Sequence, residues 1–269
     1  MDLIQAVILG IVQGATEFIP VSSSGHLVLL PWLLGWESPG LVFDTVVHWG
    51  PLVAVLAYFW RDWWNLITSW LRGLLRWDWR DPNARLMWLI LVGSIPAVVI
   101  GYLLEDFFES LFGQPAWVCV FMMVTAGVLA SAEWLGKKTR DLNDLHWPDA
   151  LIIGIGQAAA IAPGISRSGA TISVGLYRGV KRAAAARFIF LLGTPIIFGA
   201  GLLQLADLLS VPDAGARVPA LVAGFLAAAT VGYLCIWFLL RYLQRGKLYP
   251  FAVYCFLVGL ACLIVVWLR

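Results

Sequence analysis

The sequence predicts an all-α integral membrane protein with six transmembrane helices and two re-entrant helical hairpins. Of its 269 residues, 61% are hydrophobic and only 13% are charged, whereas a soluble domain carries about 25% charged residues. The charged residues cluster between long apolar runs, and polar motifs interrupt two of these runs. We therefore expect a single membrane domain over residues 1–269, with much of its surface facing lipid.

Net charge and cysteine usage exclude other classes of protein. A net charge of +2 is too small to indicate a nucleic-acid partner. No basic segment precedes the first apolar run, from Leu3 to Gly14, so we expect no secretory signal. The four cysteines lie inside apolar runs without metal-ligand spacing and are expected to be packing residues.

Six segments have, or nearly have, the roughly 20 apolar residues needed to cross a bilayer. They are 43–60, 86–104, 116–135, 186–205, 218–240 and 250–268. Residues 3–35 and 150–177 are also apolar, but polar motifs at 20–26 and 163–169 divide them into halves of about 10 to 17 residues, a length that suits a re-entrant hairpin. Non-helical backbone at membrane depth needs protein or water around it, so both breaks are expected to line a cavity.

The distribution of Lys and Arg predicts the orientation of the chain in the membrane. Residues 1–60 contain neither, whereas 61–85 and 136–149 are rich in them. The segments 105–115 and 206–217 are mainly acidic. We therefore expect 61–85 and 136–149 to be cytoplasmic loops, both termini to lie outside, and the second hairpin to enter from the cytoplasm.

The chain also repeats itself at an offset of 144 residues. Residues 10–13 match residues 154–157, and Ser24-Gly25 matches Ser168-Gly169. Each repeat, 1–136 and 150–269, then contains one hairpin and three spans. Because an odd number of spans reverses the direction of insertion, the sequence predicts an inverted-topology repeat whose two hairpin tips approach each other.

The two tips carry the residues expected to form one phosphate-handling site. Arg167 offers a planar fork of donors for phosphate oxygens, and the turns at Gly25 and Gly169 offer hydroxyl and backbone N–H groups at helix N-termini. Ser22, Ser23 and Ser24 are candidate nucleophiles, with Glu17 and His26 as candidates for base, orienter or acid. An ionisable group at membrane depth costs about 2.5 kcal/mol or more, which favours a paired, functional role.

Structural alternatives remain for the same residues. Serine, glycine and proline at a helix break also serve as caps and turns. Glu17 could hold the fold through a backbone contact, and Arg167 could extend its charge to the membrane surface.

The residues Gln13-x-x-x-Glu17, the motif Pro20-Val21-Ser22-Ser23-Ser24-Gly25-His26 and the later motif from Pro163 to Thr171 closely resemble the bacterial undecaprenyl-pyrophosphate phosphatases of the bacitracin-resistance type. The resemblance implies hydrolysis of undecaprenyl pyrophosphate to undecaprenyl phosphate, the carrier lipid of peptidoglycan and other wall polymers. It also implies a place in the bacterial cytoplasmic (inner) membrane, with a site that opens to the outer face.

The same resemblance implies roles for individual residues. Glu17, Ser23, His26 and Arg167 match the essential positions of the family. Around them lies an expected substrate-binding set of Gln13, Ser22, Ser24, Gly25, Ser166, Ser168, Gly169 and Thr171. Members are similar in depending on Mg²⁺ or Ca²⁺, with Glu17 as the expected metal ligand. The family has Glu or Gln at position 13, and the Gln present here leaves one carboxylate fewer to hold a metal.

The expected mechanism is attack by Ser23 on the terminal phosphorus, with His26 or Glu17 taking its proton and the lipid tail lying between spans. Direct attack by water, with Ser23 only a ligand, is the open alternative. A lipid-phosphate flippase is the alternative function, because inverted repeats with broken helices are typical of transporters. The expected partners are the polyprenyl pyrophosphate substrate and membrane lipid; a homodimer is left open.

Overall fold

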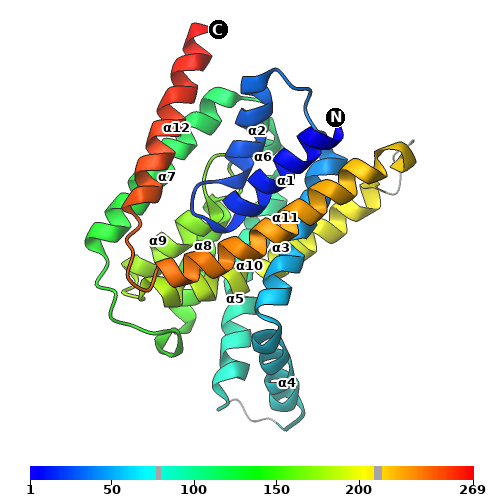
Figure 1. The fold of residues 1–269 in the computed structure, drawn as a ribbon. Coiled ribbons are helices and arrows are strands. Elements are labelled where there is room, and N and C mark those ends of the chain that lie inside the picture. The colour runs from blue at the N-terminus through cyan, green and yellow to red at the C-terminus, as the bar shows by residue number, and fades with distance from the viewer. Residues whose placement is uncertain (77–79, 209–213) are drawn as a thin grey trace.

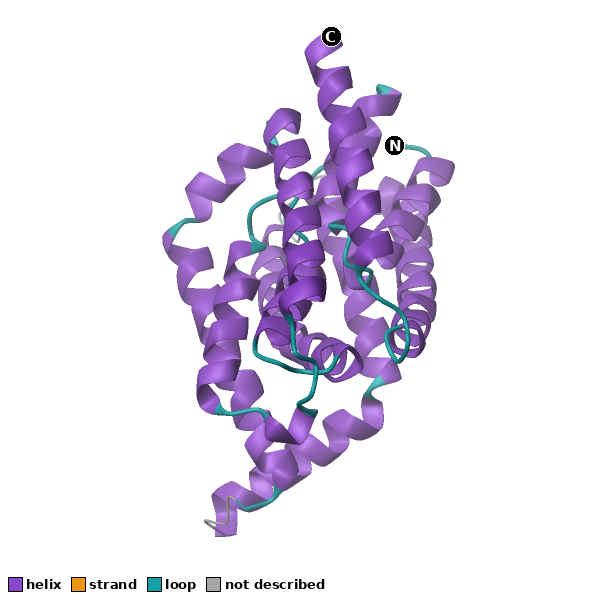
Figure 2. Cartoon of the chain, turned by 90° about the vertical axis from the view of Figure 1, so that its left-hand side faces the viewer, coloured by secondary structure: helices purple, strands orange, loops and turns teal. Residues whose placement is uncertain are grey.

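The computed structural model describes residues 1–76, 80–208 and 214–269. Within these ranges the chain forms twelve α-helices, one short 3₁₀ helix and no strand (Figures 1 and 2). The helices are α1 (Leu3–Phe18), α2 (Ser23–Leu34), α3 (Leu41–Tyr58), α4 (Trp60–Arg76), α5 (Pro82–Leu103), α6 (Glu105–Phe112), α7 (Pro115–Leu135), η1 (Leu142–Asp144), α8 (Trp147–Ala159), α9 (Arg167–Tyr177), α10 (Arg182–Leu208), α11 (Ala214–Tyr242) and α12 (Tyr249–Leu268).

Five of the described helices are long and apolar enough to cross a membrane. They are α5, α7, α12 and the segments Arg182–Leu202 of α10 and Val218–Tyr242 of α11. Helices α3 and α4 together pass as a sixth, with a bend of 76° between them. The predicted all-helical class is therefore confirmed, and the helices fit a multi-pass membrane protein.

The prediction of a loop over residues 61–85 was wrong, because α4 occupies most of this segment. The predicted span 43–60 corresponds to α3, which the chain leaves at Tyr58 to enter α4. On α4, Trp63, Leu66, Ser69 and Gly73 are buried at helical spacing, and the helix packs against α5. Exposed arginines interrupt the apolar run of α4, so its charge pattern is that of a loop outside the membrane. Helix α6 likewise occupies most of the expected loop 105–115.

The two polar motifs interrupt the helices as predicted. The first break separates α1 from α2 at residues 19–22, and the second separates α8 from α9 at residues 160–166. In each case a serine caps the second helix: the Ser22 Oγ accepts a hydrogen bond from the Gly25 N–H, and the Ser166 Oγ accepts one from the Gly169 N–H. The caps satisfy backbone donors that a helix N-terminus otherwise leaves unpaired.

The first helix of each hairpin packs against a helix from the opposite half of the chain. Helix α1 lies along α11 and α8 lies along α5, while α7 and α12 run side by side (Figure 1). A Cβ atom on Gly10 would overlap the carbonyl oxygen of Gly224, and one on Gly154 would overlap that of Gly93. Small residues thus let the backbones approach closely, as is common between membrane helices.

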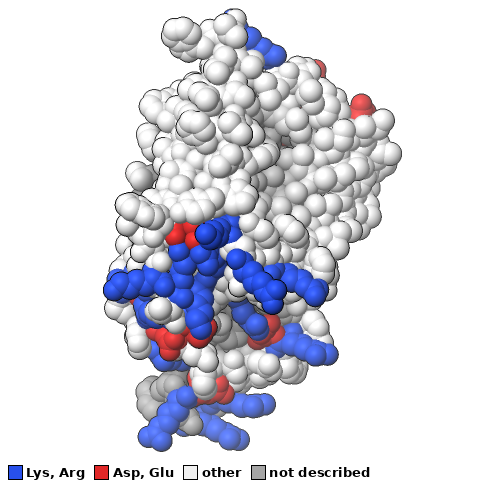
Figure 3. Space-filling model, turned by 60° about the vertical axis from the view of Figure 1, so that its left-hand side comes forward, with Lys and Arg blue, Asp and Glu red and all other residues white. Residues whose placement is uncertain are grey.

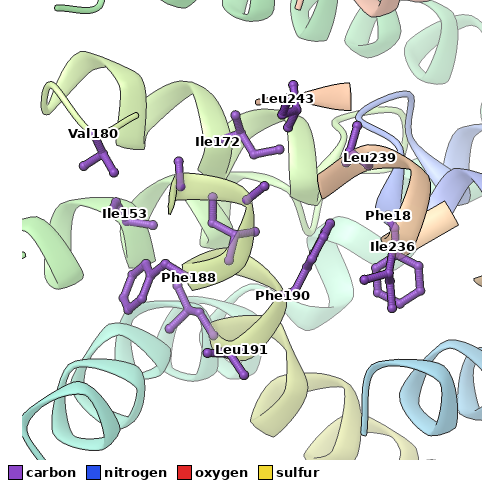
Figure 4. Packing of buried hydrophobic residues seen from close by; sticks show 14 of the residues in the cluster. Phe18, Ile153, Ile172, Val180, Phe188, Phe190, Leu191, Ile236, Leu239 and Leu243 are labelled. Carbon is purple, nitrogen blue, oxygen red and sulfur yellow. The ribbon is translucent and has the colours of Figure 1, made fainter. Parts of the chain in front are cut away.

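A cluster of buried hydrophobic residues packs against the end of α1, next to the first break. Phe18 at the end of α1 makes an edge-to-face contact with Phe190 of α10, at a ring-centroid distance of 5.3 Å. Phe188, Leu191 and Ile236 belong to the same buried cluster (Figure 4). This packing fixes the end of α1, and therefore Glu17, against the second half of the chain.

Ion pairs fasten the helix ends on the side of the molecule where Lys and Arg gather (Figure 3). Glu133 at the end of α7 pairs with Arg182 at the start of α10, and Asp149 in the first turn of α8 pairs with Arg140 and Arg178. Burial acts to raise the pKa of Asp149, but hydrogen bonds from Arg140, the His146 N–H and Arg178 hold it well below its usual range.

Substituting Gly10→Ala should destabilise the fold by about 1–3 kcal/mol, because the added methyl group forces α1 away from α11. Gly127→Ala is the matched control, since a Cβ there meets no atom within 4 Å. Thermal unfolding in detergent should show a lower midpoint for Gly10→Ala than for Gly127→Ala. Equal midpoints would mean that α1 and α11 do not approach as closely as described.

Candidate functional site

The first turn is sharply bent at Ser22. This residue has φ 72° and ψ 100°, a conformation uncommon for a residue that carries a side chain. Such backbone strain costs of order 1–3 kcal/mol and is often found at functional sites. The bend starts α2 at Ser23 and leaves Ser23, Ser24 and His26 partly exposed, while Ser22 is 2% exposed.

The second turn is held against α7. Gly164 has φ 99°, and a Cβ atom there would overlap the carbonyl oxygen of Val118, so only glycine fits. The Thr125 hydroxyl donates to the Gly164 carbonyl at 3.2 Å and accepts from the Ser166 N–H at 3.1 Å. These two bonds fix the backbone immediately before Arg167.

The two turns touch each other, as the sequence predicted. The Gly164 N–H donates to the Ser24 Oγ at 3.4 Å, and the Ser168 Oγ donates to the Ile19 carbonyl at 3.3 Å. A Cβ atom on Gly25 would lie 3.4 Å from the Gly164 Cα. Residues about 140 positions apart therefore form one continuous polar surface.

Glu17 lies at the centre of this surface. Its Oε1 accepts from Arg167 Nη2 at 2.8 Å, and its Oε2 accepts from the Ser23 hydroxyl at 2.6 Å and from Gln13 Nε2 at 2.9 Å. Glu17 is only 8% exposed, and a buried carboxylate needs such partners to stay charged. Of the candidate bases, Glu17 is the one that contacts the Ser23 hydroxyl.

Arg167 extends between the two halves of the chain. One guanidinium nitrogen donates to Glu17, and Nη1 donates to the Gly193 carbonyl at 3.2 Å. A Cβ atom on Gly193 would lie 2.6 Å from Nη1, so a larger residue would displace the guanidinium. The planar group has five N–H donors, which leaves donors for a phosphate while these two contacts persist.

His26 makes its ring hydrogen bonds to groups other than the Ser23 hydroxyl. Its Nδ1 lies 2.7 Å from the Ser22 carbonyl oxygen, and its Nε2 lies 2.8 Å from the Tyr254 hydroxyl. Both ring nitrogens therefore have partners other than Ser23. Of the two bases that the sequence left open, Glu17 accepts a hydrogen bond from the Ser23 hydroxyl in this structure.

Three residues predicted to bind substrate have other roles in this structure. The Gly25 and Gly169 N–H groups donate to the capping serines. The Thr171 hydroxyl is buried and donates back to the Arg167 carbonyl within α9. In this structure, capping and back-bonding satisfy these groups locally, and their binding of substrate stays a prediction. Ser166 and Ser168 are also buried and bonded to each other, at 3.2 Å.

A divalent cation fits this donor set only together with a substrate. Among the residues that the structure describes, no group of three His, Cys, Asp or Glu side chains could hold a metal. The Gln13 Oε1, however, is buried without a hydrogen-bond partner, and it lies on the amide that contacts Glu17. Mg²⁺ commonly takes one or two protein oxygens and completes its shell with substrate phosphates and water, which suits Gln13 and Glu17.

Sequence reasoning missed Thr125 and Tyr254. Thr125 is on α7 and Tyr254 is on α12, in apolar spans far from either motif. A threonine or tyrosine in a membrane span carries no signal of its own. Only the folded arrangement shows that each contacts one of the two turns.

The fold and the site define a class: a helical membrane protein in which a buried glutamate contacts an arginine and a serine where two helices break. The model of the bacitracin resistance protein BacA family matches residues 6–261, and the chain belongs to this family. It is 47% identical over 269 residues to the "Undecaprenyl-diphosphatase" of Desulforudis audaxviator (strain MP104C), and the alignment covers 100% of both chains. It is 44% identical to the proteins of the same name from Moorella thermoacetica, with 100% of both chains covered, and Thermomicrobium roseum, with 99% covered. The family resemblance of the two motifs is confirmed.

Proposed function

We propose that this chain is an undecaprenyl-diphosphatase that hydrolyses undecaprenyl pyrophosphate to undecaprenyl phosphate and inorganic phosphate. The observation that carries the proposal is the hydrogen bond from the Ser23 hydroxyl to Glu17, 2.6 Å long, beside the guanidinium of Arg167. The proposal is supported because a candidate nucleophile, a candidate base and a guanidinium that can bind an anion lie together. The product would return to wall synthesis as carrier lipid, and its regeneration would confer bacitracin resistance.

In the mechanism that we propose, Glu17 takes the proton from Ser23 as the Ser23 Oγ attacks the terminal phosphorus. The bond between this phosphorus and the bridging oxygen breaks, and lipid phosphate leaves with that oxygen. Water then cleaves the phosphoserine, which releases inorganic phosphate and restores the Ser23 hydroxyl. Direct attack of water on the substrate, with Glu17 as base, is the alternative route.

Arg167 would bind the terminal phosphate with the donors that Glu17 and Gly193 leave free. Ser24, partly exposed at the contact between the turns, would add a hydroxyl. Gln13 Oε1 and Glu17 would hold a Mg²⁺ or Ca²⁺ ion, which neutralises phosphate charge when bound. Arg167 also keeps Glu17 ionised and therefore able to accept a proton.

We further propose that repeats 1–136 and 150–269 are inverted copies, each with a re-entrant hairpin. The packing of α1 on α11 and of α8 on α5 supports this, because each first hairpin helix meets a span of the other repeat. The paired glycine contacts, Gly10 with Gly224 and Gly154 with Gly93, follow the same relation. Both termini lie towards one end of the molecule, and most of the visible Lys and Arg gather towards the other (Figures 1 and 3), which supports termini outside.

The flippase remains the alternative function, since the proposed repeat is also a transporter architecture. The Ser23–Glu17 hydrogen bond favours hydrolysis, because an anion transporter needs no activated nucleophile. Phosphate release from undecaprenyl pyrophosphate by purified protein in detergent tests the choice, since transport is impossible there. A protein that binds the lipid but releases no phosphate would exclude the phosphatase.

Ser23→Ala should abolish turnover while leaving substrate affinity largely intact, since Arg167 still holds the phosphate. Ser24→Ala should lose no more than a hydrogen bond, about 0.5–1.5 kcal/mol. Ser22→Ala should mainly lower stability, by about 0.5–2 kcal/mol, through the lost cap. Phosphate release and lipid binding should be measured on all three variants. A Ser23→Ala variant that retains a tenth or more of the wild-type kcat would exclude the covalent route.

Arg167→Lys should be nearly as damaging to kcat/KM as Arg167→Ala. Lysine keeps the charge but lacks the planar fork that reaches Glu17, Gly193 and a phosphate together. Arg187→Lys is the control, because the Arg187 side chain is 47% exposed and pairs with Asp62 away from the two turns. If Arg167→Lys retained most of the wild-type kcat/KM, a positive charge at this position would be sufficient for activity, and the planar fork would not be needed.

A cysteine at position 110 should react with a membrane-impermeant thiol reagent in intact cells, and one at position 75 should not. Both positions are exposed in the structure, so only the membrane would protect the second. The four native cysteines are replaced beforehand, and permeabilised cells should label at both positions. Labelling at 75 but not at 110 in intact cells would contradict the proposed orientation.

A further inference from the structure

The contact between His26 and Tyr254 joins the first turn to the last helix of the chain. The His26 Nε2 lies 2.8 Å from the Tyr254 hydroxyl. The two rings are nearly parallel, at 9°, with centroids 5.7 Å apart. Two independent contacts, a hydrogen bond and a ring stack, therefore fix the position of the imidazole.

The proton positions of the pair follow from its neighbours. A carbonyl oxygen can only accept, so His26 Nδ1, 2.7 Å from the Ser22 carbonyl, must carry hydrogen. In neutral imidazole the other nitrogen, Nε2, then has the lone pair. The Tyr254 hydroxyl donates to this lone pair. One tautomer thus satisfies both contacts.

Helix α12 is a rigid support for Tyr254. The neighbouring Cys255 thiol lies 3.6 Å from the Pro20 carbonyl oxygen, in the same turn. At its N-terminus the Leu248 N–H donates to Glu133, which pairs with Arg182. Along its length α12 packs on α7, with Gly259 close to the Cys119 carbonyl. Tyr254 therefore lies on a helix whose position is fixed relative to the first turn.

The pair also lies on the accessible side of the site. Tyr254 is 43% exposed and His26 is partly exposed, whereas Glu17 and Gln13 are buried. A substrate that reaches Ser23 from this side would pass beside the two rings.

We propose that Tyr254 is a positioning residue of the site, which holds His26 in the Nδ1–H tautomer and in one ring orientation beside Ser23. This rests on the proposed phosphatase function. Tyr254 acts through His26, so its effect on the reaction should vanish when His26 is absent.

Tyr254→Phe tests the proposal, because phenylalanine keeps the ring stack and removes only the hydroxyl. We expect kcat to fall roughly three- to tenfold, the effect of one neutral hydrogen bond, with KM little changed and the pH–rate profile altered. In a His26→Ala background, Tyr254→Phe should cause no further loss. Tyr233→Phe is the matched control, since Tyr233 is also 43% exposed and makes an edge-to-face contact with the Tyr58 ring of α3.

A second measurement does not depend on activity. The chain has three histidines, so ¹⁵N NMR of histidine-labelled protein can identify His26 by the signals lost in His26→Ala. The wild type should show a protonated Nδ1 and an unprotonated Nε2, and Tyr254→Phe should move the Nε2 signal towards that of a nitrogen without a hydrogen bond.

Three outcomes would overturn the proposal: the opposite tautomer in the wild type, an Nε2 signal unchanged in Tyr254→Phe, or additive losses of kcat in the double variant. A wild-type protein that releases no phosphate would instead refute the proposed function. In that case the NMR signals would still decide whether Tyr254 positions His26.

Discussion

The structure depends on one ion pair between the two halves of the chain, from Glu17 on α1 to Arg167 on α9. Both groups are largely withdrawn from water, with side-chain exposures of 7% and 20%. Removing one member of a buried pair costs about 3–5 kcal/mol, because the other charge is left without a partner. Glu17 lies just before the first helix break and Arg167 just after the second, so the pair forms only when the two breaks lie next to each other. The two turns, the serine caps and the close glycine contacts between helices hold the breaks in that position.

The two helix breaks also explain why the serines have different roles. A broken helix leaves backbone N–H groups that nothing in lipid can satisfy. Ser22 and Ser166 satisfy such groups as caps, so they are occupied by structure. Ser23, one residue further on, points its hydroxyl at Glu17 instead. A run of three serines is thus informative because its members face different partners.

Prediction from the sequence succeeded where the signal was local. The polar motifs located both breaks, and the cost of buried charge indicated that Glu17 and Arg167 meet. It failed where the answer depended on distant partners. Helix α4 was missed because its buried face is completed by α5, and the caps that use the Gly25 and Gly169 amides appear only in the folded turns. Thr125 and Tyr254 lie in apolar spans, whose sequence says nothing of the turns they contact.

The electrostatics of the site require the two proposed repeats to differ. At the offset of 144, Glu17 corresponds to Ile161, Ser23 to Arg167 and His26 to Ala170. Two identical hairpins meeting tip to tip would place two carboxylates together and supply no cation, and like charges at close range are strongly unfavourable in a low dielectric. Exchanging the acid for isoleucine and the serine for arginine in one copy turns this repulsion into the Glu17–Arg167 attraction. The residues that stay the same include the capping serines, Ser22 and Ser166, and two glycine pairs, Gly10 with Gly154 and Gly25 with Gly169, which both copies need to break and pack their helices.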